Sequence, residues 1–159
     1  MILIPENDGY EFINVYSQAR TELGRKLSNF SFHPFVHPKY GKFNSVEGAW
    51  YYFKTGRLHE RLRKLSGSNA KEIGMSYIPK EWKNEDIITN ELKNFIKECT
   101  QAKLRTHKDI LEELISTNLP LVHYYEENGK IRNKSQYNWI LEEIDRIRKV
   151  TQKWYLNKH

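Results

Sequence analysis

The chain has 159 residues and a formal net charge of +6, and 38% of its residues are hydrophobic. This length suits one hydrophobic core, so we predict a single domain over residues 1–159. No apolar run reaches the ~20 residues of a transmembrane helix, and the N-terminal residues lack the basic lead of a secretory signal. With Cys99 as the single cysteine, we expect a cytoplasmic protein without a disulfide framework or a membrane partner.

The first predicted elements are two short strands. Alternating β-branched and aromatic residues predict one strand within 12–16, and a second one is expected around Phe35 and Val36. Pro34 and Pro38 argue that the chain around this second strand is extended rather than helical.

Helical patterns dominate the rest of the chain. Asn44 and Glu47 form a capping-box pattern, which predicts a helix that ends at Gly56. Periodic apolar positions predict further helical segments at 58–65, 69–74, 86–104, 106–119 and 136–154, with 86–104 as the longest. The expected fold class is mainly α: one compact orthogonal helical domain with a few short β-strands near the N-terminus.

Glu47 is the most informative residue, because it is the single acid between Glu22 and Glu60 and its neighbours are mostly aromatic. One interpretation is structural: a carboxylate in the first helical turn reaches back to a backbone amide and stabilises the helix by about 1 kcal/mol. The other is chemical, since Tyr51 and Lys54 share its helix face and Gly48 beside it leaves room for a ligand. Aromatic burial and a nearby lysine tune the pKa of such an acid for acid–base work.

Other polar and aromatic residues also allow two interpretations each. Asn29 suits ribose hydroxyls or the amide of a base, although an Asx-turn is the commoner role of such a residue. Trp82 either fixes the entry of the following helix or stacks on a base. Lys71 and Lys103 lie on apolar-patterned helices, where a lysine either extends its charge to solvent or presents it to phosphate.

Metal and nucleotide-cofactor chemistry lack support in the sequence. Prolines flank His33 and His37, and no second cysteine completes a zinc ligand set. Walker-type, dinucleotide and nucleophile-elbow glycine patterns are missing as well. We therefore expect neither a metal nor a cofactor.

Four blocks of sequence, in this order, resemble the YbiA-like or NADAR family. They correspond to its "SNF" block, its "SxE" helix, its "AK…G" turn and its late "L-V" segment, at residues 27–30, 45–54, 70–74 and 119–125. The lead at 21–25 and the His-Tyr-Tyr ending look like the branch often found in bacteriophages. The resemblance extends from about residue 13 to about residue 149.

The resemblance implies a mainly helical N-glycosidase. Some family members cleave the base–ribose-phosphate bond of early riboflavin-pathway intermediates, and others remove ADP-ribose from guanine in nucleic acid. A phosphoribosylated base and an ADP-ribosylated guanine or nucleic acid are therefore alternative substrates here. The competing interpretation is a non-catalytic ADP-ribose or nucleotide-binding module, and the positive charge alone would suit a small nucleic-acid-binding protein.

The resemblance also assigns roles to residues of this chain. Glu47 matches the essential glutamate of the family, Trp82 matches a tryptophan implicated in the site, Asn29 matches the asparagine of the "SNF" block, and Lys71 matches the lysine of the "AK" turn. We expect Glu47 to act as general base or charge stabiliser. The predicted substrate-binding residues are Asn29, Phe30, Trp50, Lys54, Lys71 and Lys103.

A family aspartate implicated in catalysis falls near Glu127 and Asn128, where this chain has no aspartate. The Trp-Gly pair that follows it in the bacterial branch is also missing. Either Glu127 or Asn128 takes this role, or Glu47 acts alone. The predicted catalytic residues are accordingly Glu47, Trp82 and Asn128.

Overall fold

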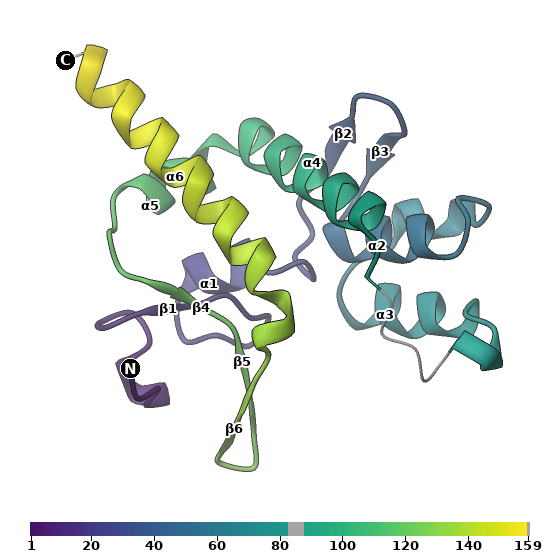
Figure 1. The fold of residues 1–159 in the computed structure, drawn as a ribbon, viewed down its shortest axis with the longest axis horizontal. Helices are drawn as coiled ribbons and strands as arrows, with labels where there is room; N and C mark the ends of the chain where they lie inside the picture. The colour runs from purple at the N-terminus through teal and green to yellow at the C-terminus, as the bar shows by residue number, and fades with distance from the viewer. Residues whose placement is uncertain (83–87, 159) are drawn as a thin grey trace. The chain divides into compact units, whose positions relative to one another are not determined.

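The computed structural model describes residues 1–82 and 88–158 (Figure 1). These residues form six α-helices, four short 3-10 helices and three two-stranded sheets, which confirms the expected mainly-α fold class with a few short strands. Contacts divide the chain into two compact units, Met1–Ser28 with His107–His159 (unit 1) and Asn29–Thr106 (unit 2). That residues 1–159 act as one domain stays a prediction. None of the helices described is long and apolar enough to span a membrane.

Unit 2 combines a β-hairpin with three α-helices. In chain order its elements are β2 (Phe35–His37), β3 (Gly41–Phe43), α2 (Val46–Lys54), η2 (Glu60–Lys64), α3 (Gly67–Ser76), η3 (Lys80–Trp82) and α4 (Asn90–Thr106). The strand expected at Phe35 and Val36 is confirmed, and it pairs antiparallel with β3, which the sequence did not indicate.

An aromatic cluster forms the core where α4 packs on α2 and the hairpin. Phe43 is completely buried, and Phe95 of α4 is 2% exposed. The Phe95 ring stacks on Phe53 of α2 with centroids 4.7 Å apart and meets Phe43 edge-on at 6.0 Å. The many rings in the sequence therefore serve mainly to join α2, α4 and the hairpin.

The start of α2 differs from the predicted capping box. Ser45, not Asn44, is the N-cap, and its hydroxyl accepts a hydrogen bond from the Gly48 N–H at 3.0 Å. Asn44 still belongs to the extended chain, because its own N–H donates to the Arg63 carbonyl at 2.8 Å and its side chain reaches Lys64. The prediction of Asn44 as a cap is wrong for this reason.

Two further helix boundaries also differ. The prediction of a short turn at 69–74 closed by Gly74 is wrong, because α3 runs continuously from Gly67 to Ser76 with Ser66 as its N-cap. Helix α4 begins at Asn90; the first part of the predicted 86–104 segment, 86–87, lies outside the described residues.

Unit 1 contains a parallel strand pair, a hairpin and the C-terminal helix. Its elements are η1 (Pro5–Asn7), β1 (Ile13–Asn14), α1 (Glu22–Leu27), α5 (Lys108–Ile115), β4 (Leu121–Val122), β5 (Tyr124–Glu127), β6 (Lys130–Asn133), η4 (Ser135–Tyr137) and α6 (Asn138–Lys158). Strands β1 and β4 pair parallel, and β5 and β6 pair antiparallel. Strands therefore lie near the C-terminus as well as near the N-terminus.

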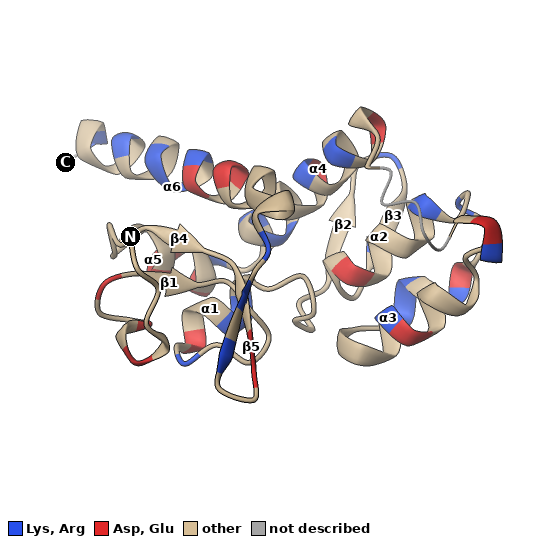
Figure 2. Ribbon diagram, turned by 60° about the horizontal axis from the view of Figure 1, so that its bottom comes forward, with Lys and Arg blue, Asp and Glu red and all other residues tan. Residues whose placement is uncertain are grey.

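Helix α6 has 21 residues and α4 has 17, so the prediction that 86–104 forms the longest helix is wrong. Ion pairs at helical spacing line α6: Asp145 pairs with Lys149 at 2.8 Å, and Glu143 pairs with Arg146. Figure 2 shows Lys and Arg along the C-terminal half of α6.

Candidate functional site

Glu47 occupies the second position of α2, and Ser45 has already capped this helix. The Glu47 backbone N–H donates to the Asn29 carbonyl at 2.9 Å, which satisfies an amide that the helix itself leaves without a partner. Within the described chain, the Glu47 carboxylate accepts no hydrogen bond. The structural interpretation of Glu47 as a capping carboxylate is therefore wrong.

Burial governs the chemistry of this carboxyl group. It raises the pKa of Glu47 to about 7, while the ammonium group of Lys71 on α3 opposes that rise. The side chain is half-buried, so solvent still reaches it although protein atoms surround the carboxyl group. Near neutral pH both the protonated and the ionised form are populated, so Glu47 can donate or accept a proton.

Two glycines bring α2 close to its neighbours. A Cβ on Gly74 of α3 would lie 2.2 Å from Cγ of Tyr51, so α3 packs directly on α2 one turn beyond Glu47. A Cβ on Gly48 would lie 2.4 Å from the Leu62 carbonyl oxygen. The space expected beside Gly48 for a ligand is thus filled by backbone, and that expectation is wrong.

The segment from Asn29 to Ser31 contacts the three α-helices of unit 2. Asn29 binds the start of α2, as described above, and the Phe30 carbonyl accepts the Gly67 N–H at the start of α3 at 2.9 Å. The Ser31 hydroxyl binds Nζ of Lys103 on α4 at 2.8 Å. The segment Asn29–Ser31, which begins within the "SNF" block, therefore links α2, α3 and α4.

Lys103 is 2% exposed, and burial lowers the pKa of its ammonium group to about 7. Its interpretation as a lysine that extends its charge to solvent is wrong, because the Nζ atom is held inside by Ser31. A buried lysine of this kind gives up its proton easily, and an incoming anion would restore it. Sequence patterns could not identify Ser31 as its partner, because the two residues are far apart along the chain.

The other predicted site residues of unit 2 are Trp50, Lys54 and Trp82. Trp50 is 8% exposed and belongs to the buried face of α2, and Lys54 ends that helix two turns after Glu47. Trp82 is 47% exposed at the end of η3, directly before residues 83–87, which lie outside the described chain. Among the described residues no contact joins Trp82 to Glu47. The alternative role of Trp82, to fix the entry of the following helix, depends on α4, which begins after residues 83–87.

Asn128 belongs to unit 1, at the tip of the β5–β6 hairpin. Asn128 and Gly129 both have positive φ, 51° and 74°, and they connect the paired residues Glu127 and Lys130. A two-residue hairpin turn with positive φ at both positions strongly favours the sequence Asn-Gly. The turn geometry by itself therefore explains why Asn is found at position 128. A catalytic role for Asn128 stays a prediction.

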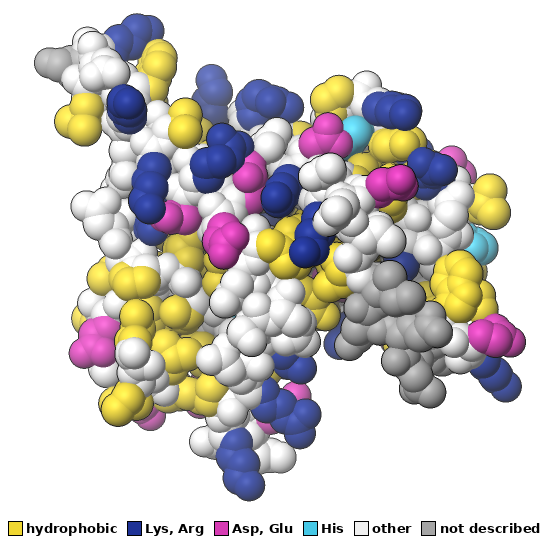
Figure 3. Space-filling view, viewed as in Figure 1, with side chains coloured by type: hydrophobic (Ala, Val, Ile, Leu, Met, Phe, Trp, Pro, Cys, Tyr) yellow, Lys and Arg dark blue, Asp and Glu magenta, His cyan; other side chains and the backbone are white. Residues whose placement is uncertain are grey.

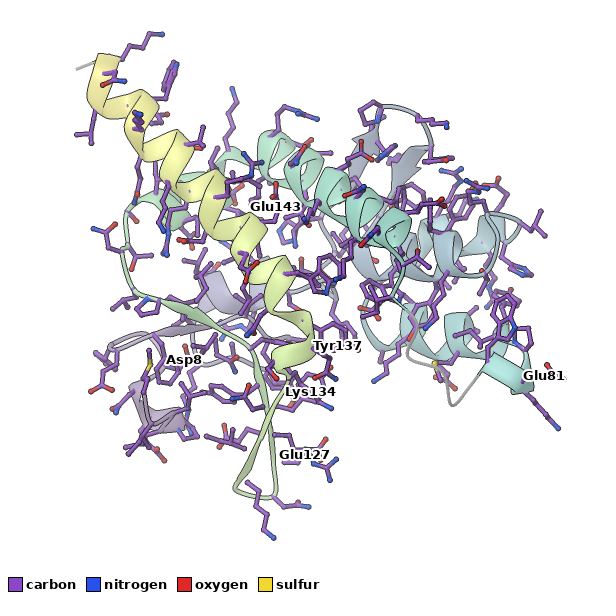
Figure 4. The ribbon with its side chains drawn as sticks, viewed as in Figure 1. Asp8, Glu81, Glu127, Lys134, Tyr137 and Glu143 are labelled. Atoms are coloured by element: carbon purple, nitrogen blue, oxygen red, sulfur yellow. The ribbon has the colours of Figure 1, made fainter. Side chains whose placement is uncertain are left out.

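Glu127 lies on the same hairpin (Figure 4), where its carboxylate pairs with Arg132 at 3.2 Å. Acids on β5 and cations on β6 face each other across this hairpin (Figure 2). Both Glu127 and Arg132 are more than half exposed, so the pair contributes little to stability.

The part of the chain that is described holds no group of three or more His, Cys, Asp or Glu side chains placed to bind a metal ion. No protein-family model, curated protein or solved structure matches this chain. The site thus consists of Glu47, Lys71, Lys103 and the Asn29–Ser31 segment, and its interpretation depends on their chemistry.

Proposed function

We propose that the protein is an N-glycosidase, which hydrolyses the bond between a base and a phosphorylated ribose. The substrate is either an ADP-ribosylated guanine, alone or in nucleic acid, or a phosphoribosylated base like those of the riboflavin pathway. The observation that carries the proposal is the Glu47 carboxyl group, buried without a hydrogen bond and with its pKa raised to about 7. The resemblance of the sequence blocks supports the same assignment.

A buried carboxylate suits this reaction because its transition state resembles an oxocarbenium ion. The C1′–N bond breaks with its electron pair leaving on the base, and positive charge develops on the ribosyl ring. An ionised Glu47 stabilises this charge and accepts a proton from the attacking water, whose oxygen bonds to C1′. Because the substrate carries less positive charge at C1′, the carboxylate favours the transition state over the ground state.

The surrounding cations suit the phosphate side of the substrate. Lys71 is exposed on α3 and acts electrostatically on Glu47, so a phosphate held by Lys71 lies near the carboxyl group. Lys103 and Lys54 are the further phosphate-binding candidates. In this proposal Asn29 binds ribose hydroxyls, and the exposed ring of Trp82 stacks on the base.

The test is to detect the products. The protein is incubated with DNA that carries ADP-ribosylated guanine and, separately, with a phosphoribosylated amine of the riboflavin type, and the released sugar phosphate is measured by mass spectrometry. We expect release from one of them, and Glu47→Gln to lower kcat by at least about 100-fold. Glu72→Gln, which removes an exposed acid from α3, serves as the control and should leave kcat unchanged.

Wild-type turnover in Glu47→Gln would show that Glu47 is not the catalytic base. A protein whose melting temperature rises with ADP-ribose but which releases no sugar phosphate from either substrate would instead be the non-catalytic binding module.

A further inference from the structure

Cations converge on the tip of the β2–β3 hairpin. Segments 37–42 and 57–64 together contain six Lys and Arg residues and a single acid, Glu60. Figure 3 shows Lys and Arg side chains at the surface around this hairpin, together with hydrophobic, His and acidic ones. We define the Tyr40 cluster as Lys39, Tyr40, Lys42, Arg57 and Arg63.

Contacts with Tyr40 join these residues into one surface. Nζ of Lys39 lies 5.3 Å from the centre of the Tyr40 ring, and Cζ of Arg57 lies 5.6 Å from it. The guanidinium of Arg63 donates to the carbonyl oxygens of Tyr40 and Lys42. Tyr40 therefore holds cations from three separate parts of unit 2 next to one another.

The backbone of Arg57 has an unusual conformation. Its φ is +64°, directly after Gly56 at +92°, and a left-handed conformation is unfavourable for a residue with a side chain. The Arg57 N–H bonds the Tyr52 carbonyl at 2.8 Å, which fixes this conformation at the end of α2. The exposed guanidinium then lies over the rings of Phe53 and Tyr40 and donates to the Tyr40 hydroxyl at 3.0 Å. Four of its five N–H donors are left for a ligand outside these contacts.

Two acids lie near the cluster. Glu60 pairs with Arg63, a member of the cluster, and the Glu98 carboxylate of α4 lies 3.2 Å from Nε2 of His37. Among the described residues, Arg63 is thus the cluster cation that pairs with an acid. Lys39, Lys42 and Arg57 are exposed cations. Arginine and lysine side chains presented at a surface in this way are the groups that contact the phosphates of nucleic acid.

We propose that the Tyr40 cluster binds the phosphate backbone of a nucleic acid. The cations lie on an exposed surface and come from several segments, which suits a chain of successive phosphates better than one small phosphate in a closed site. Tyr40 itself is covered by cations, so the surface recognises the backbone rather than stacking a base on this ring. Together with the proposed function, this surface favours a substrate carried on nucleic acid.

The test measures binding of an unmodified, fluorescein-labelled oligonucleotide by anisotropy between about 50 and 200 mM salt. The variant is Lys39→Ala/Arg57→Gly, because glycine accepts the left-handed backbone, so the Arg57 side chain is removed without straining the turn. Lys149→Ala/Lys153→Ala removes the same charge from α6 and is the matched control. Thermal unfolding of each variant checks that the fold is kept, and no glycosidase activity is needed.

We expect the Tyr40-cluster variant to bind at least about tenfold more weakly at 100 mM salt, and its salt slope to fall by roughly 1.4, the value for two lost contacts to a single strand. The control should lose less than about threefold. Equal weakening by both variants, or wild-type binding without salt dependence, would overturn the proposal. Displacement of the oligonucleotide by ADP-ribose at equal phosphate concentration would overturn it as well, because the surface would then be a small-ligand site.

Discussion

The ammonium group of Lys71 on α3 lowers the pKa of the Glu47 carboxyl group on α2, against the burial that raises it to about 7. The close approach of Gly74 to Tyr51 keeps the two helices together at this point. The protonation of Glu47 near neutral pH therefore depends first on burial and second on the Lys71 charge that α3 brings close, and the Lys71 contribution can be measured.

Replacing Lys71 by methionine should shift the pH profile of the reaction. If Glu47 works as an ionised base, kcat rises with pH through its pKa, and losing the Lys71 charge moves that pKa upward. We expect the acidic limb of the kcat profile to move to higher pH in Lys71→Met. Lys54→Met removes a charge from the end of α2 and should leave the limb in place. An unshifted limb in Lys71→Met would mean that Glu47 does not set it.

Glu47 should make the protein less stable as the pH rises. Its pKa is about 7 when folded and 4.5 when unfolded, so between these values the folded state keeps a proton that the unfolded state releases. The free energy of unfolding then falls with pH over this window, by roughly 3 kcal/mol, and stays lower above pH 7.

Glu47→Gln removes this penalty, so denaturant unfolding should show it to be more stable than wild type at pH 8 and nearly equal at pH 5. Glu72→Gln, at an exposed position, should match wild type at both. A Glu47→Gln protein that is less stable at pH 8 would show that the carboxylate supports the fold.

Lys103 should make the protein more stable as the pH rises above 7, which is opposite to the effect of Glu47. Its pKa is about 7 when folded and 10.5 when unfolded, so above pH 7 the unfolded state binds the proton that the folded state has lost. The free energy of unfolding should rise from pH 7 to about 9, by roughly 3 kcal/mol. Burial also raises the pKa of the Cys99 thiol, and this opposes any further rise at higher pH.

In Lys103→Met this rise should disappear from denaturant unfolding curves, whereas Lys97→Met, a half-buried lysine on the same helix, should keep it. Persistence of the rise in Lys103→Met would assign it to another group.

The N-cap of α2 can be identified by substitution. Ser45→Ala removes the hydroxyl that accepts the Gly48 N–H and donates to the Leu65 carbonyl at 2.8 Å, and it should cost about 1–2 kcal/mol of unfolding free energy. Asn44→Ala removes one exposed hydrogen bond to Lys64 and should cost less than about 1 kcal/mol. A larger loss in Asn44→Ala would favour the capping box that the sequence predicted.

That comparison also shows where prediction from the sequence fails. Asn44 and Ser45 are both good caps, and the spacing to Glu47 favours Asn44. Ser45 is the cap because the Arg63 carbonyl accepts the Asn44 N–H and keeps Asn44 in the extended chain. Helix existence follows from local periodicity, whereas a boundary depends on a partner nearly twenty residues away.

The sequence by itself determined the helical content, the positive charge and the isolation of Glu47 among aromatic residues, because each follows from residue types and their local spacing. Only the tertiary structure decided that the Lys71 charge acts on Glu47, that Ser31 binds Lys103, and that Lys39 and Arg57 both lie over Tyr40. Desolvation and Coulomb interactions depend on distances through space, and the residues that supply them here are far apart along the chain.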